Sequence, residues 1–389
     1  MRELISKSFI QLLIQFAVIV VQFLYFKFLN KEIEFDYFGQ ISIVVSITTV
    51  MSVFMNNNLS ILWHKGDEHQ KGALTDLLGL LHLIGSLVII MVMFLFDQNQ
   101  WLPWILVAVA FYLDSFHLRN KWRLEKEKRF NKVSTINSIA LLGSYFFMYS
   151  SIKYWPNSLG LSLVILVAAI LRLLLFKAYF NFVFPNLNLL KPFLKEYRDL
   201  ILLSGLNSFI WNMDKWIVLR LFGYNFLGVY SRILALVEMP LKASSSALSK
   251  LRLVYFIDNR DNRRDSNAII AANIVLNSIL MVCLLIYADV ILAMVNIPGV
   301  EENLKLFKTL IWIFPIRILI RDLDTYFKST NSLILSIMQK LIVIVSFVII
   351  YLIHYLLVLN SINLMVISIG ISSLLYLLGY VMVQLRDGD

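Results

Sequence analysis

The sequence predicts an all-α integral membrane protein with about twelve transmembrane helices. Three observations predict this class. Of the 389 residues, 59% are hydrophobic and 15% are charged, whereas soluble domains carry about 25% charged residues. The mean hydropathy is +0.75. Apolar runs of about 20 residues, the length that crosses a bilayer, follow one another along the chain with short connections between them.

The successive apolar runs give the expected helices in chain order. The first begins after Lys7 and lacks a small-x-small cleavage site, so we interpret it as a spanning helix and not as a cleaved signal. We expect spanning helices at 8–29, 38–61, 77–96, 101–118, 133–152, 158–180, 199–221, 226–247, 267–287, 304–322, 332–356 and 363–385. An even number of spans puts both termini on the same side of the membrane.

The distribution of Lys and Arg predicts which side that is. With the termini inside, the inside segments hold 21 of the 35 Lys and Arg residues, and the outside segments hold two, Lys31 and Lys153. Cytoplasmic loops collect positive charge, so we expect both termini in the cytoplasm. The segment 119–132 alone carries seven of these charges. We interpret it as a topology signal that also contacts anionic membrane lipids.

Several function classes are disfavoured by the same composition. The net charge of +10 is explained by the cytoplasmic loops, and no segment is long enough for a separate catalytic or nucleic-acid-binding domain, so we expect no nucleic-acid partner. Cys283 is the only cysteine, which rules out an intrachain disulfide. The five histidines are scattered, and we predict no metal site and no cofactor. A P-loop pattern is absent, which argues against ATP hydrolysis by this chain.

An internal repeat divides the chain into two halves. The segment 35–40 (FDYFGQ) precedes the second expected helix, and the segment 224–230 (YNFLGVY) precedes the eighth. In each half an apolar helix, a basic loop and a second apolar helix follow. We therefore expect two pseudo-symmetric six-helix lobes, 1–190 and 191–389. Transporters with such parallel repeats often place their substrate path between the repeats.

The start of the second half resembles a known family. The seventh expected helix ends with Asp214 and an aliphatic stretch, a turn is expected at Leu227-Gly228-Val229-Tyr230, and Pro240 lies within the next expected helix. The first half has an equivalent in Asp36-Tyr37-Phe38-Gly39. This layout resembles the polysaccharide exporters, of the O-antigen repeat-unit flippase type, in the multidrug/oligosaccharidyl-lipid/polysaccharide exporter superfamily. We expect fewer helices here than in many members.

The resemblance implies a transporter and not an enzyme. Members flip a polyprenyl-diphosphate-linked oligosaccharide, such as an undecaprenyl-diphosphate-linked O-antigen, lipopolysaccharide or capsule repeat unit, from the cytoplasmic to the periplasmic leaflet by alternating access. It also implies a location in the bacterial cytoplasmic (inner) membrane. A polysaccharide polymerase or a chain-length regulator is an implied partner. The drive would be an ion gradient, the membrane potential or removal of the substrate on the far side.

Charged residues within the expected spans are the candidate site residues, because a charge in the bilayer is expensive and usually faces a cavity or a partner. For the phosphate or acidic-sugar contacts we single out Arg317, Lys340, Arg172 and Lys215. For ion coupling we single out Asp214 and Glu238.

Each candidate has a structural alternative. Glu238 could pair with Lys242 one turn further on, Asp214 could bridge to another helix, and Arg172 and Lys340 could reach lipid phosphates. Asp114, near His117, is more readily explained by a local pair.

Two other functions compete with the flippase interpretation. A multidrug or cation-coupled efflux transporter would favour an apolar cavity with carboxylates, whereas cations outnumber anions among the charges deepest in the expected spans. A membrane polysaccharide polymerase or glycosyltransferase would need a sizeable catalytic loop outside the membrane. The longest outside loop, 288–303, contains neither His nor Arg. We therefore rank these alternatives below the flippase.

Overall fold

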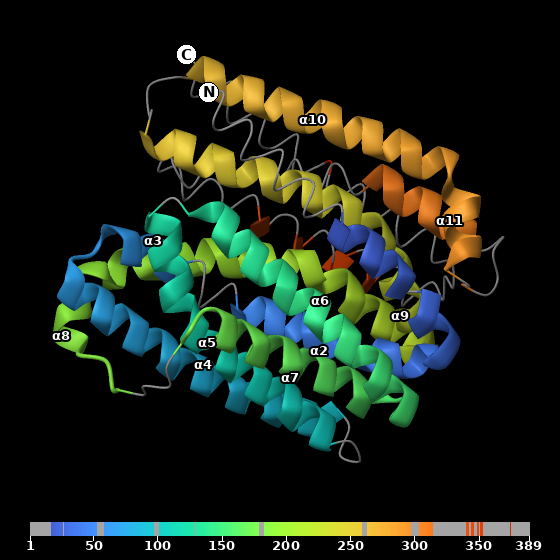
Figure 1. Cartoon of the computed structure of the whole chain (residues 1–389), viewed down its shortest axis with the longest axis horizontal. Helices are drawn as coiled ribbons and strands as arrows, with labels where there is room; N and C mark the ends of the chain where they lie inside the picture. The colour runs from blue at the N-terminus through green and yellow to red at the C-terminus, as the bar shows by residue number, and fades with distance from the viewer. Residues whose placement is uncertain are drawn as a thin grey trace. The chain divides into compact units, whose positions relative to one another are not determined.

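The computed structural model describes most of the first three quarters of the chain. The described residues are 17–25, 27–52, 58–96, 101–127, 129–178, 183–258, 263–295, 297 and 303–313, with short pieces at 340–341, 344–345, 348–349, 351–352 and 374. Every regular element in these ranges is helical (Figure 1). The expected spans 332–356 and 363–385 lie largely outside them, as do the starts or ends of 8–29 and 304–322.

The chain forms two compact units, of which one combines both ends of the sequence and the other is a single continuous segment. Unit 1 comprises Met1–Lys31 and Val229–Asp389, and unit 2 comprises Glu32–Gly228. The helical segment 194–228, which follows the midpoint of the sequence, therefore packs with unit 2, and the first helical segment packs with unit 1. The two lobes expected at 1–190 and 191–389 from the internal repeat remain a prediction.

Unit 2 contains the best described helices. They are α2 (Phe35–Ser52), α3 (Asn58–Lys65), α4 (Glu68–Phe96), α5 (Trp101–Lys126), α6 (Phe130–Tyr154), α7 (Ser158–Leu175), the short α8 (Leu187–Leu190), the 3-10 turn η3 (Lys191–Phe193) and the first part of α9 (Leu194–Asp258). α5 packs against α4 and α7, and α6 packs against α7. α2 contacts α4 and α7.

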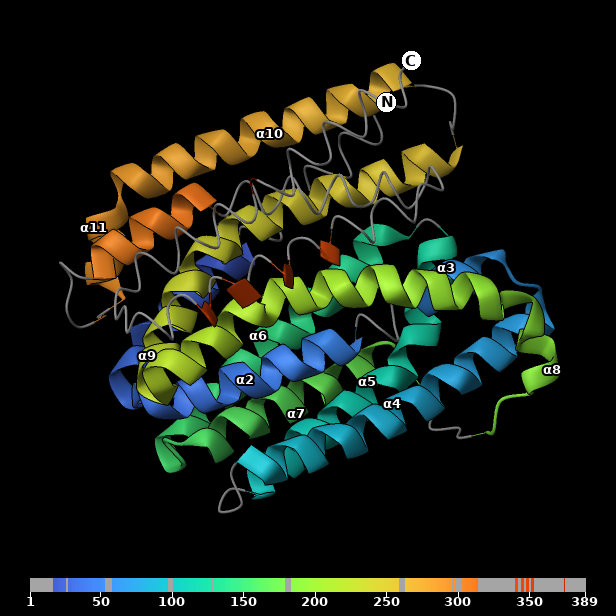
Figure 2. The ribbon, with the colours of Figure 1, turned by 180° about the vertical axis from the view of Figure 1, so that it is seen from behind.

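Unit 1 has fewer described helices. Residues 17–25 and 27–32 are helical, and the second part of α9, α10 (Arg263–Ile286), α11 (Ala288–Met294) and residues 303–313 follow. α11 is bent by 69° from the end of α10 (Figure 2). Asn30 Nδ2 donates to the Val295 carbonyl at 2.6 Å. This bond ties the first helical segment to the end of α11.

The helices α4 and α7 begin where side chains satisfy their first backbone N–H groups. At the start of α4, Asp67 Oδ1 accepts from Gln70 N at 2.8 Å, and Gln70 Oε1 accepts from Asp67 N at 3.0 Å. This is a reciprocal capping box. At the start of α7, Asn157 Oδ1 accepts from Leu159 N and Gly160 N. Such caps stabilise a helix by about 1 kcal/mol.

Gly223 divides α9 into two helices. Its φ of 80° and ψ of −178° interrupt the helical backbone, and glycine alone adopts this region readily. The break lies within the connection expected at 222–225, between the spans 199–221 and 226–247. Pro240 lies inside the second part of α9.

The two segments that define the internal repeat contact each other within unit 2. A Cβ on Gly39 would collide with the Tyr224 carbonyl oxygen, and a Cβ on Gly228 would collide with the Phe35 carbonyl oxygen. Each glycine thus packs against the carbonyl that lies four residues before the other glycine. The two repeat segments therefore resemble each other in sequence and make equivalent contacts with each other.

Three described helices are long and apolar enough to cross a membrane. They are Glu68–Phe94, Trp101–Lys126 and Ser158–Leu175, and the bent pair Val275–Ile286 and Ala288–Met294 would form a fourth span. The expected span 101–118 is longer than anticipated, because α5 continues through the basic segment to Lys126. The basic residues 119–126 are therefore helical and extend the end of a spanning helix.

Candidate functional site

One face of α5 carries three polar side chains at positions 114, 117 and 120. Residues at this spacing lie on the same side of a helix. All three contact the C-terminal end of α7, and we call this set, Asp114, His117 and Asn120 against Arg172, Phe176 and Lys177, the α5–α7 polar contact.

An ion pair lies at one end of the α5–α7 polar contact. Arg172 Nη1 donates to both carboxylate oxygens of Asp114, at 2.9 and 2.8 Å. The two side chains are 28% and 30% exposed, so the pair is half-buried. His117 Nδ1 lies 3.6 Å from Asp114 Oδ1. Asp114 thus faces Arg172 directly and His117 at longer range.

The other end of the α5–α7 polar contact caps α7. Asn120 Nδ2 donates to the carbonyl oxygens of Phe176 at 3.0 Å and Lys177 at 3.1 Å. The His117 ring stacks on Phe176, with centroids 5.2 Å apart. Lys177 has a positive φ of 52°, which turns the chain away from the helix axis. The amide of Asn120 thereby satisfies carbonyls that the end of α7 leaves without helical partners.

A second buried histidine joins α4 to α5. His82 Nδ1 lies 2.9 Å from the Phe111 carbonyl oxygen, and its ring stacks on Phe111 at 4.5 Å. Ser86 Oγ donates to the carbonyls of His82 and Ala108. α5 therefore has polar contacts with α4 on one side and α7 on the other. Among the described residues, no group of three or more His, Cys, Asp or Glu could hold a metal ion.

The predicted residues of α9 in unit 2 lie in the interior. Asp214 is fully buried, and Lys215 is half-buried. Lys215 N donates to Asp214 Oδ1 at 2.9 Å. Trp216 Nε1 donates to Ser46 Oγ of α2 at 3.0 Å, which fixes this part of α9 against α2.

The predicted residues of unit 1 are described in part. Lys340 is fully buried, and Glu238 is half-buried. Arg232, on the second part of α9, is also fully buried. The side chain of Lys242, the alternative partner of Glu238, and the whole of Arg317 lie outside the described residues.

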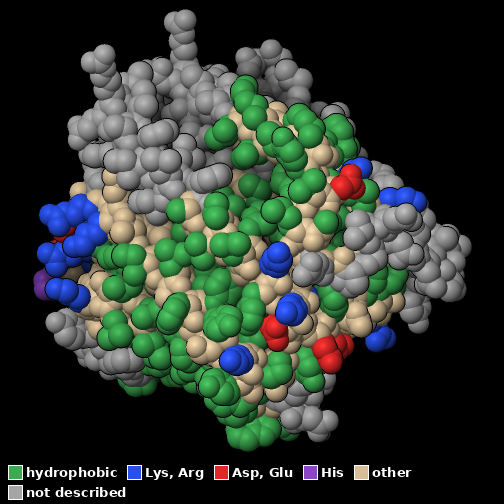
Figure 3. All heavy atoms as spheres, turned by 45° about the vertical axis from the view of Figure 1, so that its right-hand side comes forward, with side chains coloured by type: hydrophobic (Ala, Val, Ile, Leu, Met, Phe, Trp, Pro, Cys, Tyr) green, Lys and Arg blue, Asp and Glu red, His purple; other side chains and the backbone are tan. Residues whose placement is uncertain are grey.

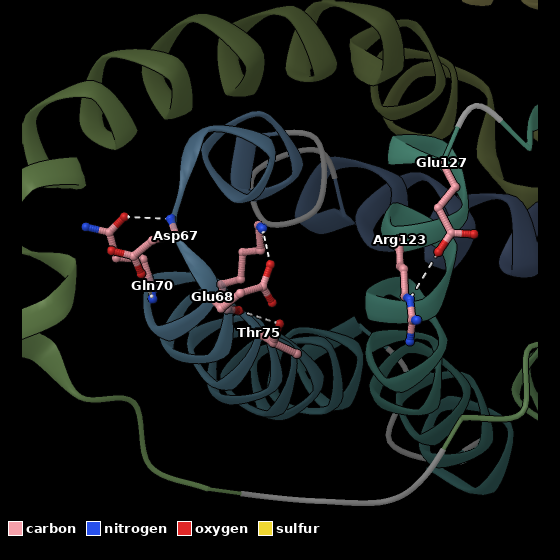
Figure 4. A network of polar contacts seen from close by, with 7 residues as sticks. Asp67, Glu68, Gln70, Thr75, Arg123 and Glu127 are labelled. Carbon is pink, nitrogen blue, oxygen red and sulfur yellow. Dashed lines mark hydrogen bonds and ion pairs between the residues drawn. The ribbon is translucent and has the colours of Figure 1, made fainter.

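A basic region lies at the end of unit 2 formed by α3, α4 and α5. The Lys71 side chain is almost fully buried, with its Nζ 5.3 Å from the Trp63 ring centroid and 2.5 Å from Glu68 Oε1. Figure 4 shows this end with its capping box and the Arg123–Glu127 ion pair, whose atoms are 3.2 Å apart. In Figure 3, Lys and Arg side chains gather at the left edge beside a histidine.

This basic region also affects the pKa of a histidine. Burial in the first place, and then the positive charges of Lys126 and Lys71, lower the pKa of His64 below its ordinary value of 6.5. His64 therefore favours the neutral form near physiological pH.

Sequence reasoning missed two features of these sites. Asp114 was expected to pair locally, but its closest partner, Arg172, is 58 residues away on another helix. Arg232 was not among the candidate site residues, yet it is among the largest fully buried side chains. A charge inside an apolar run was the available signal for both.

Comparison with known proteins gives a result for structure alone. No protein-family model matches the chain, and no curated protein matches it. A multidrug resistance MATE family transporter of the MOP superfamily, in an inward-facing conformation, is 13% identical. Its TM-score is 0.63, with 97% of this chain and 98% of that chain covered.

Two further solved structures give similar values. The lipid II flippase MurJ, in an inward closed conformation, is 14% identical, with a TM-score of 0.66 and coverage of 95% of this chain and 86% of that chain. A MOP superfamily transporter from Pyrococcus furiosus, whose binding pocket is described as reversed in polarity, is 13% identical, with a TM-score of 0.62 and coverage of 98% and 95%.

These matches confirm the predicted fold class, all-α and membrane-spanning with about twelve helices in two lobes. The chain has the fold of the MOP superfamily transporters.

Proposed function

We propose that this protein is a flippase that moves a polyprenyl-diphosphate-linked oligosaccharide, an O-antigen or capsule repeat unit, from the cytoplasmic to the outer leaflet by alternating access. The observation that carries the proposal is the burial of cationic side chains in helices of unit 1. Arg232 and Lys340 are both fully buried. An intramembrane cation is expected to serve a pathway or a partner, and a diphosphate is a partner of matching charge.

The fold supports a transporter but leaves the substrate open. The solved structures with this fold include a lipid II flippase and multidrug transporters. A lipid-linked substrate carries a phosphate-bearing head and a polyprenyl tail, so it needs cationic groups near an opening to the lipid. We propose Arg317, Lys340, Arg172 and Lys215 as the groups that contact the phosphates or acidic sugars, and a bacterial cytoplasmic membrane location with both termini inside.

Multidrug efflux is the second candidate, and one observation favours it. Asp214 is fully buried on α9, and a buried carboxylate suits either a cationic drug or a coupling cation. We propose Asp214 and Glu238 as ion-coupling groups for both the flippase and the efflux transporter. A polymerase or glycosyltransferase activity is a weaker proposal, because the transporters with this fold give no support to it.

The first test is deletion of the gene in its own host. The flippase proposal expects the lipid-linked oligosaccharide to accumulate on the cytoplasmic side and the surface polysaccharide to be lost. Both are measured by lipid extraction and surface-polymer staining. Unchanged surface polymer together with a new sensitivity to cationic drugs would instead favour efflux.

The second test compares cationic side chains in a complemented deletion strain. Arg317→Ala and Lys340→Ala should each reduce export by roughly tenfold, because a hydrogen bond to a charged group contributes about 1.5–3 kcal/mol. Protein levels, measured by immunoblot, should stay unchanged. Lys153→Ala is the matched control, since Lys153 is exposed at the end of α6. Normal export by the Arg317 variant would remove that residue from the proposed substrate path.

A further inference from the structure

The ring of His117 has a buried nitrogen without a hydrogen bond. Its Nδ1 is buried and has no hydrogen-bond partner among the described residues, although Asp114 Oδ1 lies 3.6 Å away. The side chain is only 6% exposed. A buried polar atom without a hydrogen bond costs about 1–3 kcal/mol, so this nitrogen requires an explanation.

The Asp114 carboxylate that faces this nitrogen suggests an explanation. A bare Nδ1 lone pair is repelled by the Asp114 carboxylate, whereas an Nδ1–H group is attracted to it, and the attraction is strongest when the ring is protonated and carries a full positive charge. Asp114 already accepts two hydrogen bonds from a single nitrogen of Arg172. The carboxylate therefore has one cation in direct contact, and His117 can supply a second when it gains a proton.

We propose that His117 is a proton-binding site, and that its proton competes with Arg172 for the carboxylate of Asp114. The proton adds to Nδ1 from solution and moves the imidazolium toward Asp114 Oδ1. The carboxylate then divides its charge between two cations, and its hold on the guanidinium weakens. This inference concerns proton binding and does not depend on which substrate is carried.

The surroundings of His117 come from three helices. The charged and titratable groups that act on it are Asp114 and Lys121 of α5, Arg172 of α7 and His82 of α4. Asp114 is the single anion in this set, so it is the group through which a proton on His117 is stabilised. Because His117 lies beside the Asp114–Arg172 ion pair, that ion pair is the contact that a proton on His117 controls.

The consequence for the helices follows from linkage. If the Asp114–Arg172 pair alters proton binding at His117, then the proton alters the pair by the same factor. Asp114, His117 and Asn120 share one face of α5, and all contact the end of α7. Proton uptake therefore weakens the ionic end of the α5–α7 polar contact, while the cap made by Asn120 remains.

The test is a histidine titration of the full-length protein. Only five histidines are present, so protein labelled with ¹⁵N in the histidine rings and held in nanodiscs should give a resolvable spectrum. His117→Gln assigns the signal. In the wild type we expect the His117 signal to change with pH while the protein stays folded. Asp114→Asn should move its midpoint to lower pH, and Arg172→Gln should move it to higher pH, each by about 1 unit.

Two controls separate this effect from misfolding. Arg172→Lys keeps the positive charge and should leave the midpoint near that of the wild type, and every variant should elute from size exclusion as the wild type does. Should one variant fail to fold, the opposite shift in the other still decides the proposal. A His117 signal that does not titrate, or that titrates identically in all folded variants, would overturn it.

Discussion

Asp114 and Arg172 lie on helices that are long and apolar enough to cross a membrane, where a single charge costs about 2.5–3.5 kcal/mol. Their two short hydrogen bonds neutralise both charges in place. Arg172 can therefore bind a phosphate group only by sharing or exchanging this carboxylate. Its proposed substrate role thus includes a change of partner.

A double-mutant cycle measures the strength of this ion pair. Asp114→Ala and Arg172→Ala should each lower the thermal stability of the purified protein, because each leaves one charge inside the helices without its partner. The double variant should lose less than the sum, by about 1 kcal/mol, since the pair is half-buried. Melting in detergent, followed by size exclusion, gives the comparison. Strict additivity would show that the two side chains do not interact.

A second residue-scale prediction concerns His64. Its pKa is lowered in the folded protein, first by burial and then by Lys126 and Lys71. The unfolded chain, with a pKa near 6.5, then binds this proton more readily than the folded protein. The contribution of His64 to stability is therefore present above about pH 6.5 and is lost as the pH falls below it.

The ¹⁵N titration that reports on His117 also measures this shift. Lys126→Gln, at the end of α5, should raise the pKa of His64 toward its ordinary value, and Lys153→Gln, at the far end of α6, should leave it unchanged. Equal values in the wild type and the Lys126 variant would mean that the charge of Lys126 does not reach the ring.

At the level of elements, α2 and α9 contact each other through two glycines. Gly39 and Gly228 each face a backbone carbonyl of the other repeat segment, so no side chain fits between the two segments. Backbone oxygens cannot rotate away as a flexible side chain can. Both glycines lie in helices, and the turn expected at 227–230 is not formed. The repeated glycine is thus explained by the close approach of the two backbones.

Alanine substitution tests this explanation. Gly39→Ala and Gly228→Ala should each lower stability by about 1–3 kcal/mol, the usual effect of overpacking a tight contact. Gly72→Ala and Gly79→Ala on α4 are matched controls, because a Cβ there meets nothing within 4 Å. Alanine favours a helix by about 1 kcal/mol over glycine, so these controls should be neutral or stabilising. Thermal melting of the four variants gives the order, and equal losses in all four would contradict the explanation.

At the scale of the whole molecule, the two compact units do not coincide with the two halves of the sequence. Residues 1–31 group with 229–389, and residues 194–228 group with the first half. Unit 2 ends at Gly228, inside the second repeat segment, and unit 1 begins again at Val229. The basic segment that opens with Arg119 continues α5 beyond the apolar run. One end of unit 2 thereby collects the charge that the sequence assigns to the cytoplasm.

Cysteine labelling tests this orientation. Cys283 is the only cysteine and is exposed, so a Cys283→Ser background permits single substitutions. Lys153→Cys should react in intact cells with a membrane-impermeant maleimide, and Arg123→Cys should react only after the membrane is opened. Both positions are exposed, so accessibility in the protein is matched. Labelling of Arg123→Cys from outside would reverse the predicted topology.

The spanning helices and their breaks could be predicted from local sequence. Apolar runs are long enough to identify α4, α5 and α7, and the turn at Gly223 lies in the expected connection. These features depend on hydropathy and on backbone preferences of neighbouring residues, which a single sequence displays directly. The all-α membrane fold follows from the same local signals, because every backbone group in the bilayer must be paired.

The candidate sites depended on contacts between residues that are distant in sequence. Nothing near Asp114 indicates that Arg172, 58 residues later, is its partner, and a buried charge such as Arg232 is equally compatible with several faces of its helix. The rotation of each helix about its axis is set by the packing of its neighbours, and hydropathy that is high on all sides carries no information about it. The sequence therefore identified which charges enter the membrane helices, and packing alone determined which partners they meet.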